Sequence, residues 1–320
     1  MTGRARLVRW MPVAVSVVSL VGLALLVDLR EMLRAFDSRA LLRMAPTLAG
    51  YGVASLALEA WSLVRLAPRG GAHLDAWGAA RMKAASYLVQ LVHYSLGMAA
   101  LAYLLGKRTR TSAGRATGTV LLLAGVDVAV LALLTVASVR GLGSDAGALR
   151  LGLLVLLLAG FAAGLLVLRA NVPLGPLGRL RNLPPFEVAR AVPLGALAEV
   201  AFLRLLFAGS FVVMVGLVIH GFGIRATPAE LTVRVAFLLL VSALPIAVAG
   251  IGTGQAAFVY VFRGRADPAT LMACSLALSI GLLALRGLMG LLFAGEYGKA
   301  AFSAVKRGEL EPPGAADSAS

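Results

Sequence analysis

ALPIAVAGIGTGQAAFVYVFRGR, the stretch at residues 243–265, interrupts a long apolar region with one proline and three closely spaced glycines. Proline removes a hydrogen-bond donor and glycine is a weak helix former, so a helix is predicted to break at Pro245 and along Gly250, Gly252 and Gly254. In lipid, a broken helix is tolerated only where protein or a water-filled cavity covers the freed backbone groups. Such breaks indicate the binding sites of transporters. The alternative is a simple kink or a tight helix crossing, because small residues are common where membrane helices meet.

The composition of the chain identifies its class. Of its 320 residues, 60% are hydrophobic and only 14% are charged, and the mean hydropathy is +0.90. Several apolar runs approach or exceed the roughly 20 residues that a helix needs to cross a bilayer. The net charge of +15 would suggest nucleic-acid binding in a soluble protein, but here the basic residues lie in short loops beside apolar runs. In that setting they indicate topology and contacts with anionic lipids. The single cysteine, Cys274, excludes an intramolecular disulfide.

The sequence predicts an all-α, polytopic membrane helical bundle with about six full spans. The first apolar run has no small-residue cleavage site after it, so we expect it to be retained as a span. A Pro- and Gly-rich stretch at 169–190 is predicted to be a hinge, which gives a membrane domain at 1–308 with halves of about 1–170 and 188–308. Residues 309–320 are predicted to be a disordered polar tail. The six predicted spans are residues 11–27, 46–64, 117–139, 151–168, 191–219 and 271–295.

A second unusual apolar stretch resembles the first one. Residues 84–105 read AASYLVQLVHYSLGMAALAYLL, with several polar residues in the middle. When the chain is shifted by about 157 positions, SLGMAALAYLLGKR lies over GTGQAAFVYVFRGR, with Gly97 over Gly254 and Met98 over Gln255. Each copy ends in a short basic loop that precedes another apolar run. The alignment suggests an internal repeat, although alanine-rich sequences also match by chance.

The distribution of basic residues favours two re-entrant helical hairpins. If every apolar stretch crosses the membrane, the inside and outside segments each carry 14 Lys and Arg. If the stretches around 93–97 and 250–254 instead enter and return to the same side, the inside segments carry 18 and the outside segments 10. The positive-inside rule prefers the second arrangement, with both termini cytoplasmic. The two hairpins would then enter from opposite faces, as in the inverted repeats of many transporters.

The chain resembles a known family at these same residues. The run Pro245-x₄-Gly250-Ile251-Gly252 with the following AAFVY, and GRATGTVLLLAGVDVAVL at 114–131, are similar to the lysylphosphatidylglycerol synthase transmembrane region, also called flippase-like. Members typically carry a glutamate in each hairpin motif. Here Met98 and Gln255 occupy those two positions, the first hairpin lacks its proline, and Ala249 replaces one glycine of a pair. The chemistry of those carboxylates would therefore be lost or moved in this protein.

The resemblance implies the binding or translocation of an anionic or lipid-linked headgroup across the cytoplasmic (inner) membrane, without a soluble catalytic domain. Asp127 matches an aspartate position of the family. Charged residues within spans usually face the protein interior or a cavity, so Arg204 and Arg286 are candidates for binding a phosphate. A structural salt bridge to Asp127 or Glu199 is the alternative for either arginine. The predicted substrate-binding residues are Gly97, Met98, Asp127, Arg204, Pro245, Gly250, Gly252, Gly254, Gln255 and Arg286.

Two further polar residues within spans permit more than one interpretation. Glu59 lies less than two turns from Arg65, so it is either a snorkelling interfacial group or functional. Glu199 and Arg204 are five residues apart, about 140° around a helix, and so they are not assumed to pair.

Three classes of function are compatible with the sequence. The first is a protein that binds or translocates membrane phospholipids or a lipid-linked substrate. The second is an integral-membrane lipid transferase, against which the missing motif glutamates count. The third is a non-catalytic subunit that partners a lipid-modifying enzyme or a glycosyltransferase. No histidine pair has metal-ligand spacing and no Cys-x-x-Cys occurs, so we expect neither a metal, a cofactor nor an enzymatic activity.

The re-entrant topology predicts the membrane side of each loop. In a Cys274→Ser background, Thr111→Cys should react with an impermeant thiol reagent only from the cytoplasmic side, and Ser144→Cys only from outside. Labelling in right-side-out cells and in inverted vesicles measures this. Reaction of the Thr111→Cys protein from outside would contradict the re-entrant topology.

Overall fold

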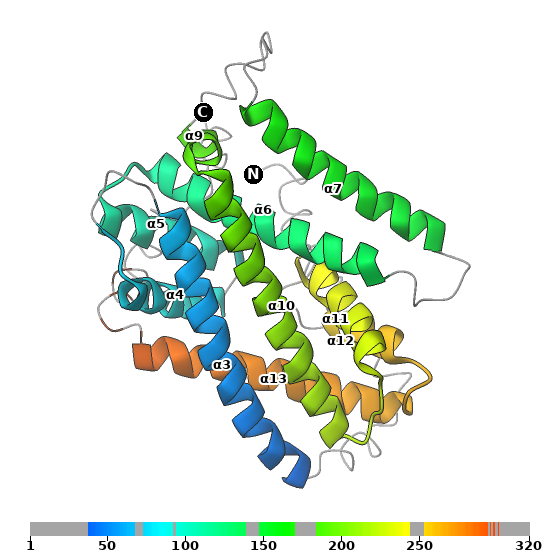
Figure 1. Ribbon diagram of the computed structural model, residues 1–320. Helices are drawn as coiled ribbons and strands as arrows, with labels where there is room; N and C mark the ends of the chain where they lie inside the picture. The colour runs from blue at the N-terminus through cyan, green and yellow to red at the C-terminus, as the bar shows by residue number, and fades with distance from the viewer. Residues whose placement is uncertain are drawn as a thin grey trace, which may run out of the picture. The chain divides into compact units, whose positions relative to one another are not determined.

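The computed structural model describes residues 38–67, 73–91, 94–138, 147–169, 184–243 and 253–293, together with 295, 297 and 300. This part of the chain folds into ten helices and contains no strand, which confirms the all-α prediction (Figure 1). The predicted span at 11–27 and the predicted tail at 309–320 lie outside the described residues. The helices are α3 Ser38–Leu66, α4 Ala76–Gln90, α5 Tyr94–Thr109, α6 Ala113–Ser138, α7 Gly147–Arg169, α9 Pro184–Ala191, α10 Leu194–Gly221, α11 Pro228–Ala243, α12 Thr253–Phe262 and α13 Pro268–Phe293.

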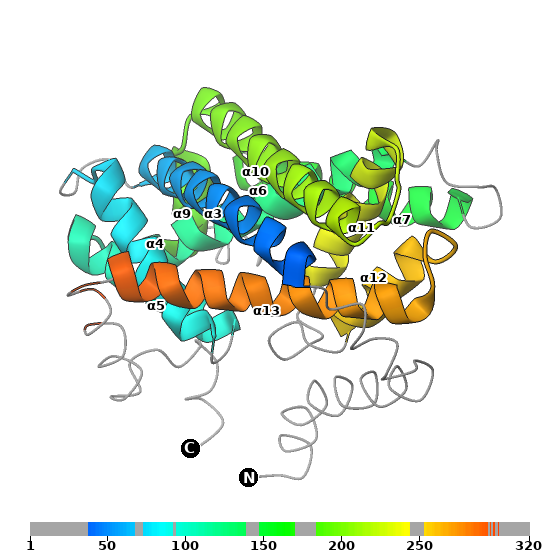
Figure 2. The same ribbon diagram turned by 90° about the horizontal axis from the view of Figure 1, so that it is seen from below.

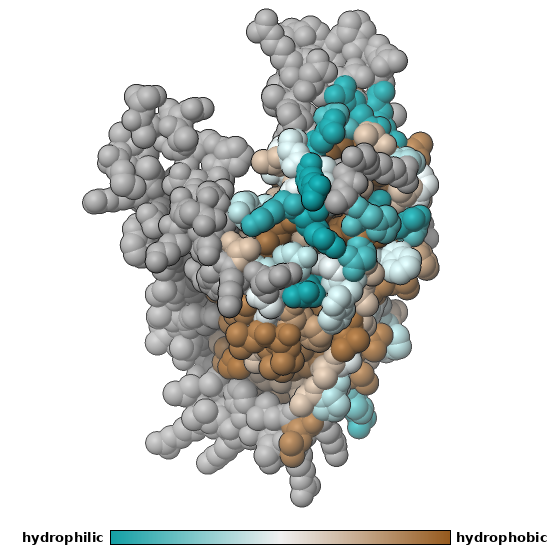
Figure 3. Space-filling model, turned by 90° about the vertical axis from the view of Figure 1, so that its left-hand side faces the viewer, coloured by the Kyte–Doolittle hydropathy of each residue, from teal (hydrophilic) through white to brown (hydrophobic). Residues whose placement is uncertain are grey.

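Four helices in the described part are long and apolar enough to cross a membrane: Met44–Leu66, Ala113–Thr135, Leu194–Gly221 and Pro268–Phe293. They lie close to four of the predicted spans, while the total of six stays a prediction. Many of their large apolar side chains are exposed, for example those of Leu121, Phe202 and Leu217. Extensive exposed apolar surface is typical of a protein that lies in lipid. On the face drawn in Figure 3, hydrophobic and hydrophilic side chains gather in separate areas.

Two pairs of shorter helices replace the two broken apolar stretches. The stretch at 84–105 is divided between α4 and α5, which have 15 and 16 residues and pack against each other. The apolar region that contains the opening stretch is divided between α11, with 16 residues, and α12, with 10, which also contact each other. None of the four reaches the roughly 20 residues of a spanning helix. Pro245, Gly250 and Gly252 lie between α11 and α12, outside the described residues, and the re-entry of the pairs stays a prediction.

The chain forms two compact units whose segments alternate along the sequence. The first unit comprises Met1–Val53, Leu131–Leu151 and Ala208–Leu285, and includes α11 and α12. The second comprises Ala54–Val130, Gly152–Phe207 and Arg286–Ser320, and includes α4, α5 and α9. The long helices α3, α6, α10 and α13 each contribute residues to both units. This division follows packing, and so it differs from the sequence halves predicted for the repeat.

The first unit has a large apolar core. Phe258 and Phe262 of α12 stack one turn apart, with ring centroids separated by 4.6 Å, and Tyr51 meets Phe211 edge-on at 5.5 Å. Cys274 of α13 is buried in the same core. Because lipid is as apolar as these side chains, van der Waals packing rather than the hydrophobic effect favours such contacts within the membrane, and α12 is held by its aromatic face.

In the second unit, α4 has a capped N-terminus and α5 packs closely against its C-terminal end. The Asp75 side chain accepts a hydrogen bond from the backbone nitrogen of Gly78, which caps the N-terminus of α4 and lowers the pKa of that carboxyl group. Gly97 of α5 is buried against Gln90 at the end of α4. A Cβ atom at Gly97 would overlap the Gln90 Cγ atom and lie 3.0 Å from the Gln90 Cα atom. The pair therefore depends on glycine at this position.

This contact distinguishes Gly97 from Gly254, the glycine aligned with it in the predicted repeat. Gly97→Ala should lower the thermal unfolding midpoint in detergent, because the backbone of α4 cannot move aside without cost, about 1–3 kcal/mol for overpacking. Gly254→Ala at the aligned position is the matched control, since no described atom lies within 4 Å of an added Cβ. Equal midpoints for the two variants would show that α4 and α5 do not approach each other this closely.

Candidate functional site

Two spanning helices run antiparallel in the second unit and place their charged residues opposite each other. Arg65 of α3 forms an ion pair with Glu199 of α10, and Glu59 of α3 faces Arg204 of α10, with Oε1 and Nη1 3.8 Å apart. The helices α3 and α10 lie side by side in both ribbon views (Figures 1 and 2). Glu199 and Arg204 thus pair with different partners, in agreement with their 140° separation around the helix.

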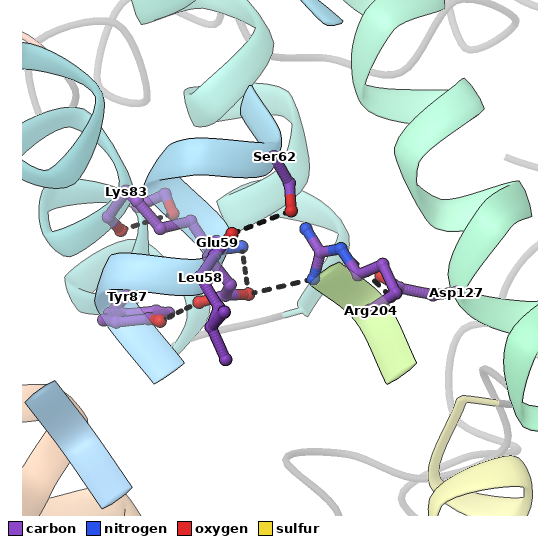
Figure 4. Close-up of polar contacts among 8 residues, drawn as sticks. Leu58, Glu59, Ser62, Lys83, Tyr87, Asp127 and Arg204 are labelled. Carbon is purple, nitrogen blue, oxygen red and sulfur yellow. Dashed lines mark hydrogen bonds and ion pairs between the residues drawn. The ribbon is translucent and has the colours of Figure 1, made fainter. Parts of the chain in front are cut away.

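Glu59 is the centre of a buried polar cluster. Its carboxylate lies 2.9 Å from the Nζ atom of Lys83 and accepts a hydrogen bond from the Tyr87 hydroxyl. Lys83 and Tyr87 are one turn apart on α4, so their side chains reach the same partner. The side chains of Glu59 and Lys83 are only 10% and 9% exposed. The snorkelling interpretation of Glu59 is therefore wrong for this fold, and the side chain faces the protein interior (Figure 4).

Arg204 lies between two carboxylates, as Figure 4 shows. Besides the contact with Glu59, its Nε atom is 3.3 Å from Asp127 Oδ1 of α6. The Arg204 side chain is only 2% exposed. Within the described part of the chain, its buried Nε and Nη2 atoms have no hydrogen-bond partner of good geometry. A guanidinium has five donors, so this arginine is neutralised by charge but not satisfied by hydrogen bonds.

The cluster has one open side, at Asp127. The Asp127 side chain is 35% exposed, whereas Glu59, Lys83 and Arg204 are almost fully buried. Two carboxylates and two cations make these four residues neutral as a set. Neutrality limits the cost of placing charges in a membrane-embedded region, where single charges are expensive.

Arg286 and Tyr94 lie at the edge of this cluster. The guanidinium of Arg286, from the C-terminal half of α13, is 5.8 Å from the centre of the Tyr87 ring. Tyr94 begins α5 and lies within electrostatic range of Asp127, Glu59, Arg204 and Arg286. Arg286 is exposed, and in the described residues no carboxylate lies within salt-bridge distance of it.

The structure brings three of the predicted site residues into one region, namely Asp127, Arg204 and Arg286. Gly97 and Met98 belong to the same unit, in α5, where the Met98 side chain is half-buried. Gly254 and Gln255 belong to α12 of the first unit, and the buried Gln255 donates a hydrogen bond to Ser279 Oγ at 2.9 Å. The expected meeting of the two hairpin tips stays a prediction.

Sequence reasoning missed Lys83 and Tyr87 as members of the site. Lys83 precedes the apolar stretch at 84–105, but α4 begins at Ala76, so this lysine lies within the helix. The sequence does contain two indications of this arrangement. Asp75 is a good N-cap residue for a helix that begins at Ala76, and the i, i+4 spacing places Lys83 and Tyr87 on one face of that helix. Among the described residues, no three His, Cys, Asp or Glu side chains are grouped in a way that could hold a metal ion.

The buried and the exposed ion pairs should differ in their effect on stability. Glu59→Gln leaves Lys83 and Arg204 buried with one counter-charge fewer, which should cost about 3–5 kcal/mol. Glu199→Gln is the matched control, because its pair with Arg65 is 35–43% exposed and should contribute roughly 0–1 kcal/mol. Thermal or denaturant unfolding in detergent measures both. Similar losses for the two variants would show that Glu59 is not buried among its partners.

Comparison with known proteins gives the family. The sequence profile of the lysylphosphatidylglycerol synthase TM region matches residues 10–290 of this chain. No curated protein and no solved structure matches it. The match covers most of the chain and includes every residue of the polar cluster. The protein is therefore a multi-pass membrane protein linked to lipid handling, and it belongs to the lysylphosphatidylglycerol synthase TM region family.

Proposed function

We propose that the protein binds a phosphate-bearing lipid headgroup at the Glu59–Arg204–Asp127 cluster and moves the lipid across the cytoplasmic membrane. The proposal depends on one observation about Arg204, which lies on a spanning helix. Its side chain is buried, and its Nε and Nη2 atoms have no hydrogen-bond partner among the described residues. A buried, unsatisfied donor costs about 1–3 kcal/mol. A ligand that supplies acceptor oxygens would remove this cost.

The chemistry of the cluster suits a phosphate. Guanidinium groups present a planar fork of donors that matches two phosphate oxygens. Arg204 faces Glu59, which accepts a hydrogen bond from the Tyr87 hydroxyl, and Arg286 lies against the Tyr87 ring. Family membership supports a lipid as the source of that phosphate.

The two short helix pairs support movement of the lipid as well as binding. Paired, interrupted helices in corresponding positions of a repeat are typical of transporters. Exchange of two motif glutamates for Met98 and Gln255 fits a role without a chemical step, so we propose a translocating or binding protein rather than an enzyme. Both termini are proposed to be cytoplasmic.

Substitution of the two arginines tests the function. Arg286→Ala and Arg204→Lys should each reduce translocation of a fluorescent phospholipid in proteoliposomes, by about tenfold for each lost charge-assisted hydrogen bond. Arg204→Lys should act by losing the bidentate geometry while keeping the charge. Arg65→Ala is the matched control, since it removes an arginine whose partner is Glu199.

These activities can be compared only between folded proteins. Each variant should therefore first elute as a single species in size-exclusion chromatography in detergent. If folded Arg286→Ala and Arg204→Lys proteins move lipid as fast as wild type, the arginines serve only as structural salt bridges or snorkelling groups. Loss of activity in Arg65→Ala to the same extent would point to net charge rather than to the cluster.

A further inference from the structure

We propose that lipid translocation is coupled to protons, and that the carboxylate of Asp127 takes up one proton each time a headgroup phosphate binds to Arg204. The coupling rests on the proposed function and adds a second transported species, the proton. Ionisable residues within membrane spans often belong to proton pathways. Two features assign this role to Asp127, namely its exposure and its position beside one edge of the Arg204 guanidinium.

Asp127 is the carboxylate of the cluster that water reaches. Its side chain is 35% exposed, whereas that of Glu59 is 10% exposed and has Lys83, Tyr87 and Arg204 as partners. Among the described residues, Arg204 alone lies within salt-bridge distance of Asp127. A proton from water therefore reaches Asp127 more readily than Glu59, and it displaces fewer contacts there.

Asp127 lies at the edge of the guanidinium that a phosphate would use. The Nε and Nη2 atoms of Arg204 form one edge, from which two parallel hydrogen bonds can be donated to one oxyanion. Both atoms are buried, and neither has a hydrogen-bond partner in the described part of the chain. Asp127 Oδ1 is 3.3 Å from Nε, so the two groups attract by charge without a well-formed hydrogen bond. Glu59 faces a different nitrogen, Nη1, at 3.8 Å (Figure 4).

A phosphate that binds to this edge takes the place of the Asp127 carboxylate. Its oxygens accept hydrogen bonds from Nε and Nη2 of Arg204, and Asp127 loses the cation that neutralised it. Two anions that share a site of low dielectric repel each other, so the charged form of the carboxylate becomes unfavourable. Asp127 then takes a proton from water on its open side and becomes neutral. When the lipid leaves, Asp127 returns the proton to water and pairs with Arg204 again.

The other charged groups around Asp127 do not replace the lost partner. Glu59 of α3 and Tyr94 of α5 lie within electrostatic range of it, and neither supplies a positive charge. Lys83 of α4 is within range as well, but it lies 2.9 Å from Glu59 and neutralises that carboxylate. Arg286 of α13 is assigned to the phosphate itself. One proton therefore enters the site with each phosphate and moves in the same direction as the lipid.

Proton uptake during binding tests the coupling directly. Short-chain phosphatidylglycerol is added to the purified full chain in weakly buffered detergent solution, and uptake is followed with a pH indicator. The headgroup of this lipid does not titrate near neutral pH, so any proton taken up binds to the protein. Wild type should take up about one proton per bound lipid. Wherever Asp127 is charged in the empty site, the dissociation constant should rise about tenfold for each unit of increasing pH.

Three variants assign the proton to a residue, after each has been shown to elute as a single species. Asp127→Asn imitates the protonated carboxylate, so it should bind lipid without proton uptake and more tightly than wild type at alkaline pH. Asp127→Glu restores a carboxylate and should restore the uptake. Glu199→Gln is the matched control, because its side chain is also 35% exposed, and it should take up protons as wild type does. Persistence of the uptake in folded Asp127→Asn would overturn the assignment to Asp127.

A pH gradient across proteoliposomes tests the coupling during transport. Acidification of the side from which a fluorescent phospholipid departs should accelerate its translocation by wild type, because proton and lipid move together. The same gradient should leave the rate of Asp127→Asn unchanged, since this variant has no carboxylate to protonate. A wild-type rate that does not respond to the gradient would contradict the coupling.

The remaining outcomes separate the coupling from the proposed function. Folded wild type that binds lipid with equal affinity at every pH and takes up no proton would overturn the coupling and leave lipid binding intact. Equal proton uptake with dimethyl phosphate, a phosphodiester without acyl chains, would assign the site to a soluble anion and overturn coupling to a lipid. Folded wild type that binds no lipid of any kind would overturn the proposed function as well.

Discussion

The carboxylate of Glu59 joins helices that are distant in the sequence. It lies on α3, accepts from Lys83 and Tyr87 on α4, and faces Arg204 on α10, which in turn meets Asp127 on α6. In lipid no water is present to replace a lost partner, so each of these charges depends on the others. Four helices are therefore held in register by one neutral set of charges, three of them buried, and the second unit is organised around it.

The same cluster is only partly satisfied, and this separates it from an ordinary structural salt bridge. Buried polar groups in folded proteins nearly always have hydrogen-bond partners. Glu59 follows this rule, whereas Arg204 retains buried nitrogens without a partner in the described residues. Charge neutrality and hydrogen-bond satisfaction are different conditions, and Arg204 meets only the first. A ligand with acceptor oxygens could accept hydrogen bonds from these nitrogens. We therefore propose that one cluster has both a structural and a binding role.

The two short helix pairs show how a repeated sequence pattern diverges in packing. Gly97 is buried where α5 approaches the backbone of α4, while Gly254, at the aligned position, has no described atom in the space of an added side chain. Gln255 is fully buried and bonds to Ser279, but Met98 is half-buried and apolar. Positions aligned by the predicted repeat thus differ in burial and in their contacts. We propose that binding in this protein depends on charges of the spanning helices and not on the two aligned hairpin positions.

The class of fold and the positions of most helices could be predicted from local sequence. Apolar runs of spanning length predicted α3, α6, α10 and α13, since length and hydropathy are local properties. Pro245, Gly250 and Gly252 indicated where α11 and α12 divide, whereas neither proline nor glycine occurs between the end of α4 at Gln90 and the start of α5 at Tyr94. Asp127, Arg204 and Arg286 were also found from sequence, because a charge inside an apolar run is unusual by itself. Tertiary structure decided which charges meet. Lys83 and Glu59 are 24 residues apart and Glu59 and Arg204 are 145 apart. Their pairing depends on how each helix is rotated and which helices are neighbours, and packing sets these properties whereas local composition does not.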